Sequence, residues 1–247
     1  MSGMVAMKCT WNAPAAGITT QREPMQILLT DCESDVTNAS YFAVSPDQRH
    51  ALEAAWLALV APRSGIEQAA AWWRQLFSRY AEPHRHYHNL SHIRDVLPLV
   101  EGDPAAAAAW FHDAVYDPRR DDNEEASAKL AATALRQLGF RMTTIDLVAQ
   151  MIRATARHES NQLPPQALLL LDADLSIFGS DSARYAAYVN AVRKEFQFLS
   201  HDEFRRTRVA MIERFLLRPQ IYFTRAMQER FEAQARKNLN QELALSS

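Results

Sequence analysis

Glycine and cysteine are both scarce in this chain of 247 residues, which contains 6 glycines and 2 cysteines. Turn-rich β architectures need many glycines, so their scarcity argues against a sandwich or a barrel. Cys9 and Cys32 both lie near the N-terminus, away from every candidate ligand described below. Two such cysteines fit a reduced, cytoplasmic protein better than a domain held together by disulfides.

Three further absences exclude classes of function. No apolar run approaches the roughly 18 residues that span a bilayer, so we expect no membrane partner. The net charge is −2, without the basic excess of a general nucleic-acid binder. The chain also lacks a basic start followed by a long apolar region, and therefore resembles no secretory signal. We find no glycine-rich phosphate loop, internal repeat or strand alternation.

The first 44 residues differ in composition from the rest. They are rich in Thr, Ser, Asn, Gly and Pro and show no sustained helical period. We expect 1–44 to be a mobile, poorly structured extension, and 45–247 to be one domain. Ser45 followed by Pro46 is a matched start signal for a helix. A chain that begins near Ser45 is therefore expected to fold.

Apolar residues spaced three and four apart predict an all-α domain after this point. Tryptophan and other aromatic residues in the second helix indicate core packing. The predicted helices cover about 45–60, 69–80, 93–100, 123–138, 145–158, 181–198, 201–216 and 224–239.

A His-Asp pair, His112-Asp113, ends an apolar stretch that contains the alanine run 105–109. Adjacent residues on a helix point about 100° apart, so the two side chains cannot share one face. Burying polar groups without partners is costly, and a metal ion binds both imidazole and carboxylate. The alternative is a helix end whose carboxylate is exposed.

Two other segments carry candidate ligands. His88 and His92 belong to a segment with four histidines in nine residues, and they share one face if the following helix already includes position 88. The alternative is a solvated loop. Asp172 and Asp174 lie in an apolar run, where a carboxylate needs a partner. The alternative there is a turn in which an aspartate caps a helix.

The motifs together resemble the HD superfamily of metal-dependent phosphohydrolases, whose conserved order is His … His-Asp … Asp. The likeness covers about 45–243 and is closest to one bacterial branch of predicted HD phosphohydrolases of unknown substrate. It implies an all-α domain that holds a metal between core helices. The matching segments are YHNLSH at 87–92, WFHDAVY at 110–116, DNEEASA at 122–128, LDADL at 171–175 and ARKNL at 235–239.

The resemblance implies a ligand set for one ion. By position, His92 is the first ligand, His112 the second, Asp113 the third and Asp174 the fourth. Asp172 is the rival for the last place. Asp113 also resembles the family residue that aligns the attacking water, which makes it the expected catalytic residue.

Other residues are expected around the substrate. His158 falls where members with two metals place an additional histidine. We expect His88 and His158 to line the phosphate position, or to bind a second ion only weakly. Some nucleotidases of the superfamily carry a glutamate that orients water at the position where this chain has Tyr116. In this chain Asp117 or Glu124 would orient the water instead.

Arginines near the ligands in sequence could hold a phosphate bidentately. We assign this part to Arg85, with Arg153 and Arg157 as further candidates; the alternative for each is a solvated surface charge. Nearby cations oppose a second metal beside His88 or His158. We therefore predict one tightly held ion.

The ligand set and the resemblance lead to one expected chemistry. Mixed nitrogen and oxygen ligation suits Mn²⁺, Fe²⁺, Co²⁺, Ni²⁺ or Zn²⁺ better than Mg²⁺. The resemblance implies hydrolysis of a small phosphate ester or nucleotide by a metal-activated water. One alternative is a di-iron oxygenase, which requires His88 and His158 to converge on the site. The other is a metal-binding regulatory module without turnover. The substrate and the oligomeric state do not follow from the sequence.

Overall fold

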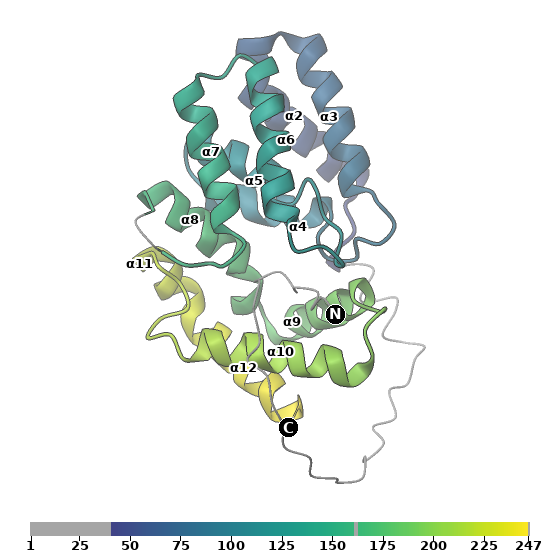
Figure 1. Ribbon diagram of the computed structural model, residues 1–247, viewed down its shortest axis with the longest axis vertical. Helices are drawn as coiled ribbons and strands as arrows, with labels where there is room; N and C mark the ends of the chain where they lie inside the picture. The colour runs from purple at the N-terminus through teal and green to yellow at the C-terminus, as the bar shows by residue number, and fades with distance from the viewer. Residues whose placement is uncertain (1–40, 161–162, 247) are drawn as a thin grey trace.

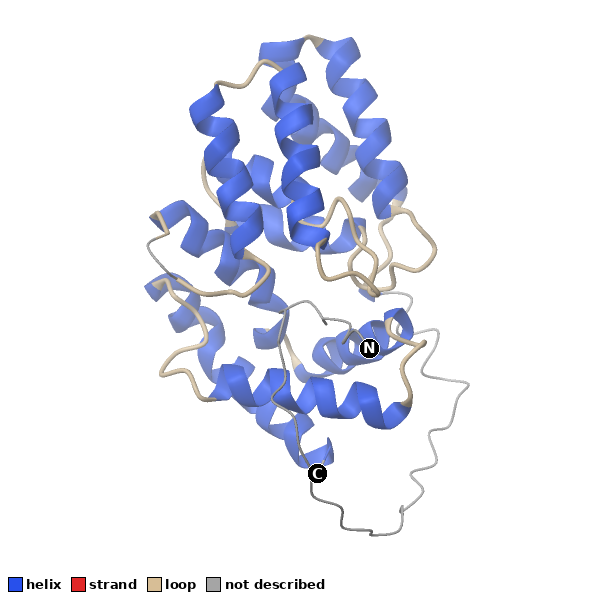
Figure 2. Ribbon diagram, in the orientation of Figure 1, coloured by secondary structure: helices blue, strands red, loops and turns tan. Residues whose placement is uncertain are grey.

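The computed structural model describes residues 41–160 and 163–246 (Figure 1). These residues form helices joined by turns and loops, and none of them lies in a strand (Figure 2). The predicted all-α fold is thereby confirmed. No helix in this part of the chain is long and apolar enough to cross a membrane.

The helices form two groups with α8 between them, and the first group is the upper one in Figure 1. The upper helices are α2 (Pro46–Ser64), α3 (Ile66–Tyr80), α4 (Leu90–Val96), α5 (Asp103–Phe111), α6 (Asn123–Gln137) and α7 (Met142–Ala154). After α8 (Pro165–Asp174) come α9 (Ser182–Glu195), α10 (His201–Leu216), α11 (Arg225–Met227) and α12 (Ala233–Ser246). Two 3-10 turns, Leu97–Leu99 and Leu175–Gly179, and a π-helical turn, Gln228–Glu232, complete the order.

Helix α2 begins where its sequence predicts. The Ser45 hydroxyl accepts the Gln48 amide at 3.2 Å, and the Gln48 side chain accepts the Ser45 amide at 3.0 Å. This reciprocal cap satisfies two backbone donors that the first turn leaves without helical partners. Helix α4 is shorter than predicted. It ends at Val96, because Pro98 cannot continue an α-helical ladder.

A cluster of tryptophans forms the centre of the upper core. The Trp110 ring meets the Trp56 ring edge to face at a centroid distance of 5.7 Å and the Trp73 ring at 5.9 Å. All three side chains are buried. The aromatic stripe of the second helix is therefore core packing, as predicted, and it holds the end of α5 in place.

A second core joins α9, α10 and α12 in the lower group. Buried Arg208 on α10 pairs with Glu242 on α12 at 2.7 Å and donates to the Tyr188 hydroxyl of α9 at 2.9 Å. The turn after α8 touches the π-helical turn so closely that a Cβ at Gly179 would lie 2.6 Å from Cβ of Phe231. These contacts fix the end of α8 against the lower helices.

Residues before Ser45 belong to the packed structure. Phe42 is 7% exposed and its ring meets Tyr87 edge to face at 5.3 Å. The Asn89 amide donates to the Phe42 carbonyl at 3.2 Å. The packed part of the chain thus starts before the predicted boundary at Ser45, since it includes Phe42. The remainder of the proposed extension, 1–40, lies outside the described residues.

We predict that Phe42→Ala lowers the free energy of unfolding by about 3 kcal/mol, because it removes a buried ring and leaves a cavity beside Tyr87. Urea unfolding followed by circular dichroism measures this change. Leu217→Ala is the control, since Leu217 is 84% exposed and its truncation should cost less than about 0.5 kcal/mol. Equal stability of Phe42→Ala and the unchanged chain would contradict the packing described here.

Candidate metal centre

Three helices bring the predicted ligands together at the junction of the two groups. His92 lies in α4, His112 and Asp113 directly follow α5, and Asp174 is the last residue of α8. The three helices contact one another pairwise. Segments 82 residues apart in sequence therefore meet at one point.

The four side chains converge on a common point. The Nε2 atoms of His92 and His112 are 3.0 Å apart, and Oδ1 of Asp174 lies 2.9 Å from the first and 3.4 Å from the second. Oδ2 of Asp113 is 3.5 Å from His92 Nε2 and 3.3 Å from His112 Nε2. One ligand atom from each residue lies within 4.8 Å of all the others.

These separations fit the coordination shell of a divalent ion. Bonds of about 2.1 Å place neighbouring ligand atoms about 3.0 Å apart at octahedral angles and about 3.4 Å apart at tetrahedral angles. The four side chains are at most 7% exposed. Two carboxylates buried close together need a compensating cation, or one of them must be protonated. The group can therefore hold a metal ion.

Backbone carbonyls orient the His112-Asp113 pair. His112 Nδ1 lies 2.9 Å from the Ala109 carbonyl, so Nδ1–H donates there and Nε2 keeps its lone pair for a metal. The Tyr80 hydroxyl donates to the Trp110 carbonyl at 2.9 Å. Arg85 donates to the Asp113 carbonyl at 2.6 Å. These bonds fix the backbone on both sides of His112.

Asp174 and Asp172 have separate partners. Asp172 is fully buried and accepts the backbone amides of Phe223 and Thr224 and the Thr224 hydroxyl, each at 2.7 Å. It therefore anchors the loop before α11, and only Asp174 belongs to the ligand group. The two residues are two positions apart, about 200° around the helix, and cannot face one ion together.

His158 touches the same group from the opposite side of Asp174. Its Nε2 lies 3.0 Å from Asp174 Oδ2, and the residue is 1% exposed. Its backbone has φ of 50°, a conformation that costs a histidine energy and persists where the surroundings impose it. His158 therefore positions the carboxylate that faces the other two histidines.

His88 is held by a residue that the sequence did not reveal. Its Nδ1 lies 2.6 Å from Oε2 of Glu195, at the end of α9, and Glu195 also accepts the backbone amides of Tyr87 and His88 at 2.7 and 2.9 Å. Tyr116 donates its hydroxyl to Glu195 at 2.7 Å. No local motif marks Glu195, because its partners lie 79 to 108 residues earlier.

The surroundings keep the Glu195 carboxylate ionised. Burial raises the pKa of this carboxyl. The attraction of His88 and the hydrogen bonds from His88 and the two amides lower the pKa by more than burial raises it, so the net pKa is below its ordinary value of 4.5.

The His88 ring lies 4.4 Å from the Tyr116 ring and 6.0 Å from the His92 ring. His88 is thus a neighbour of the metal group but not a member of it.

Arg85 is not placed as predicted. Its guanidinium is fully buried and donates to Glu82 and to the carbonyls of His88, Asp113 and Ala114. These bonds use four of its five N–H groups, so it serves the loop conformation and does not present a fork to a phosphate. Arg153 pairs with Glu125 at 2.6 Å on the surface, and Arg157 is exposed.

Comparisons with known proteins identify no relative of this chain. No family model, no curated protein and no solved structure matches the chain.

We predict that Asp174→Asn loses bound metal whereas Asp172→Asn retains it. Elemental analysis after dialysis with Mn²⁺ or Zn²⁺ should give about one ion per chain for the unchanged protein and for Asp172→Asn. Asp172→Asn should instead lower the free energy of unfolding by about 1–3 kcal/mol, since it disturbs buried hydrogen bonds. Metal loss in Asp172→Asn alone would refute the assignment. A stable value near two ions would favour a two-metal site.

We predict that Glu195 makes the free energy of unfolding depend on pH in the acid range. A carboxyl whose folded pKa is lowered stabilises the protein above its ordinary pKa of 4.5, and this contribution is lost as the pH falls through the lower folded value. Glu195→Gln should therefore cost about 3 kcal/mol near pH 7 and progressively less below pH about 4. Urea unfolding across pH measures the difference. Exposed Glu213→Gln is the control, and an equal cost at all pH values would contradict the prediction.

Proposed function

We propose that the chain is a metal-dependent phosphohydrolase of the HD superfamily that acts on a small phosphate ester or nucleotide. The observation that carries the proposal is the buried group of His92, His112, Asp113 and Asp174, whose ligand atoms lie within 4.8 Å of one another. Their order along the chain resembles the superfamily pattern His … His-Asp … Asp. A cytoplasmic location belongs to the same proposal.

The donor set suits Mn²⁺, Fe²⁺, Co²⁺, Ni²⁺ or Zn²⁺, because two imidazoles accompany two carboxylates. When bound, such an ion supplies a hydroxide at neutral pH and offsets the negative charge that develops on a phosphoryl oxygen. Asp113 takes the catalytic part in this proposal. Its carboxylate lies 3.5 Å from His92 Nε2 and 3.3 Å from His112 Nε2, and in this proposal it aligns the attacking water.

His88 takes the substrate-binding part. Its Nδ1–H is directed to Glu195 at 2.6 Å, which fixes the ring and reserves Nε2 for another partner. When the imidazole is protonated, Nε2–H can donate to a phosphoryl oxygen or to the leaving oxygen. The Tyr116 ring lies 4.4 Å from the His88 ring, tilted by 33°, and its hydroxyl donates to the same carboxylate, so Tyr116 supports His88.

A single ion is favoured over the two ions that an oxygenase of this kind needs. Such a site requires His88 and His158 to converge as ligands, and neither belongs to the group whose ligand atoms lie within 4.8 Å of one another. His158 lies 3.0 Å from the outer oxygen of Asp174 and acts there as a positioning residue. Arg85 has no substrate contact in this proposal, because it bonds to main-chain carbonyls.

We predict that Asp113→Ala abolishes metal-dependent hydrolysis, with kcat/KM at least about 10³-fold lower, while the helical circular dichroism spectrum is retained. The assay is phosphate release from a panel of phosphate esters and nucleotides with Mn²⁺, Co²⁺, Ni²⁺, Fe²⁺ or Zn²⁺. Asp146→Ala, in α7 and outside the group, is the control. Unaltered turnover in Asp113→Ala would overturn the assignment, and no turnover with any ester would favour a binding module.

A further inference from the structure

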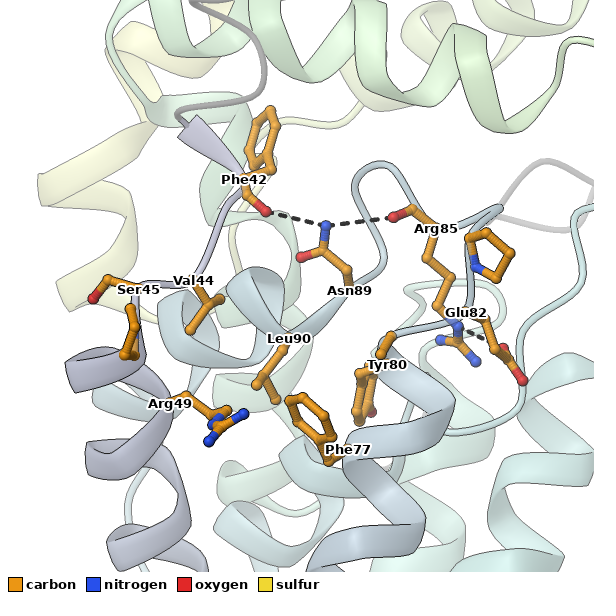
Figure 3. A pocket seen from close by; sticks show the side chains of 13 residues that line it. Phe42, Val44, Ser45, Arg49, Phe77, Tyr80, Glu82, Arg85, Asn89 and Leu90 are labelled. Carbon is orange, nitrogen blue, oxygen red and sulfur yellow. Dashed lines mark hydrogen bonds and ion pairs between the residues drawn. The ribbon is translucent and has the colours of Figure 1, made fainter.

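A cavity lies beside the segment that precedes α4. Its volume is about 490 Å³, within the range of small-molecule sites. None of the four metal ligands lines it. Figure 3 shows the cavity between α2, α3 and the loop that leads into α4.

The walls of the cavity are part apolar and part polar. Phe42 and Val44 contribute from the segment before α2, Phe77 from α3 and Leu90 from the start of α4. Such walls favour a ligand with an aromatic or branched aliphatic body, because burial removes its apolar surface from water.

The polar groups at the cavity leave one cation available. Glu82 is neutralised by Arg85 at 2.8 Å, and Asn89 donates its amide to the carbonyls of Phe42, Arg85 and His86. Arg49 is exposed and lies over the Phe77 ring at 5.4 Å. Within the described residues, Arg49 has no ion-pair partner.

We propose that this cavity is a second binding site, which takes a small amphipathic anion. The apolar body of the ligand would lie against Phe77, Leu90 and Val44. Its carboxylate, sulfonate or phosphate group would pair with the Arg49 guanidinium, which offers a planar fork of donors. None of the four candidate metal ligands lines the site, and the proposal does not depend on the proposed hydrolase function.

The probe for the test is 8-anilinonaphthalene-1-sulfonate, which joins an aromatic body to one anionic group. Its fluorescence is titrated against the full chain in EDTA, at a pH where the near-ultraviolet circular dichroism is native. We expect one site per chain. Arg49→Gln should raise the Kd at least about tenfold, because a hydrogen bond to a charged group is lost. Val44→Trp, which fills the cavity, should abolish binding.

Arg74→Gln is the matched control, since Arg74 is an exposed arginine of α3 that does not line the cavity. It should bind the probe with the affinity of the unchanged chain. Equal affinity of the unchanged chain, Arg49→Gln and Val44→Trp would place the probe elsewhere and overturn the proposal. Absence of binding to the unchanged chain would overturn it as well. Circular dichroism of each variant ensures that lost binding does not reflect unfolding.

Discussion

Two carboxylates and two imidazoles, packed within a few ångströms and shielded from water, are the constraint on which this fold depends. Groups of this kind are expensive to bury unless their charges and lone pairs meet a common partner. The close approach requires three helix termini to point inward at once. The tryptophan core around Trp110 and the hydrogen bonds to the carbonyls of residues 109, 110 and 113 hold one of these termini.

Much of the site follows from local sequence patterns. Helix periodicity places Asp172 and Asp174 on different sides of α8, and the residue that joins the His/Asp group is Asp174, which the motif favoured. His112 and Asp113 follow an apolar helix, where buried polar side chains need partners. Ser45 is recognisable as a cap because all the atoms involved lie within four residues.

What the sequence hides depends on partners far along the chain. Glu195 looks like an ordinary helix-terminal acid, and its contacts with His88 and Tyr116 appear only when α9 packs against the loop before α4. Arg85 is close to the ligands in sequence, which suggested a phosphate contact, yet its donors meet main-chain oxygens. Phe42 shows the same limit, since no periodicity marks a single aromatic residue that packs on Tyr87.

The placement of Asp174 at the end of α8 has a consequence for how the molecule can be divided. The upper helices carry His92, His112 and Asp113, whereas the fourth ligand comes from the helix that leads into the lower group. His88 likewise needs Glu195 from α9. Neither group of helices therefore contains a whole centre. Gene fragments that encode the two groups separately would yield ion binding only where the two pieces reassemble.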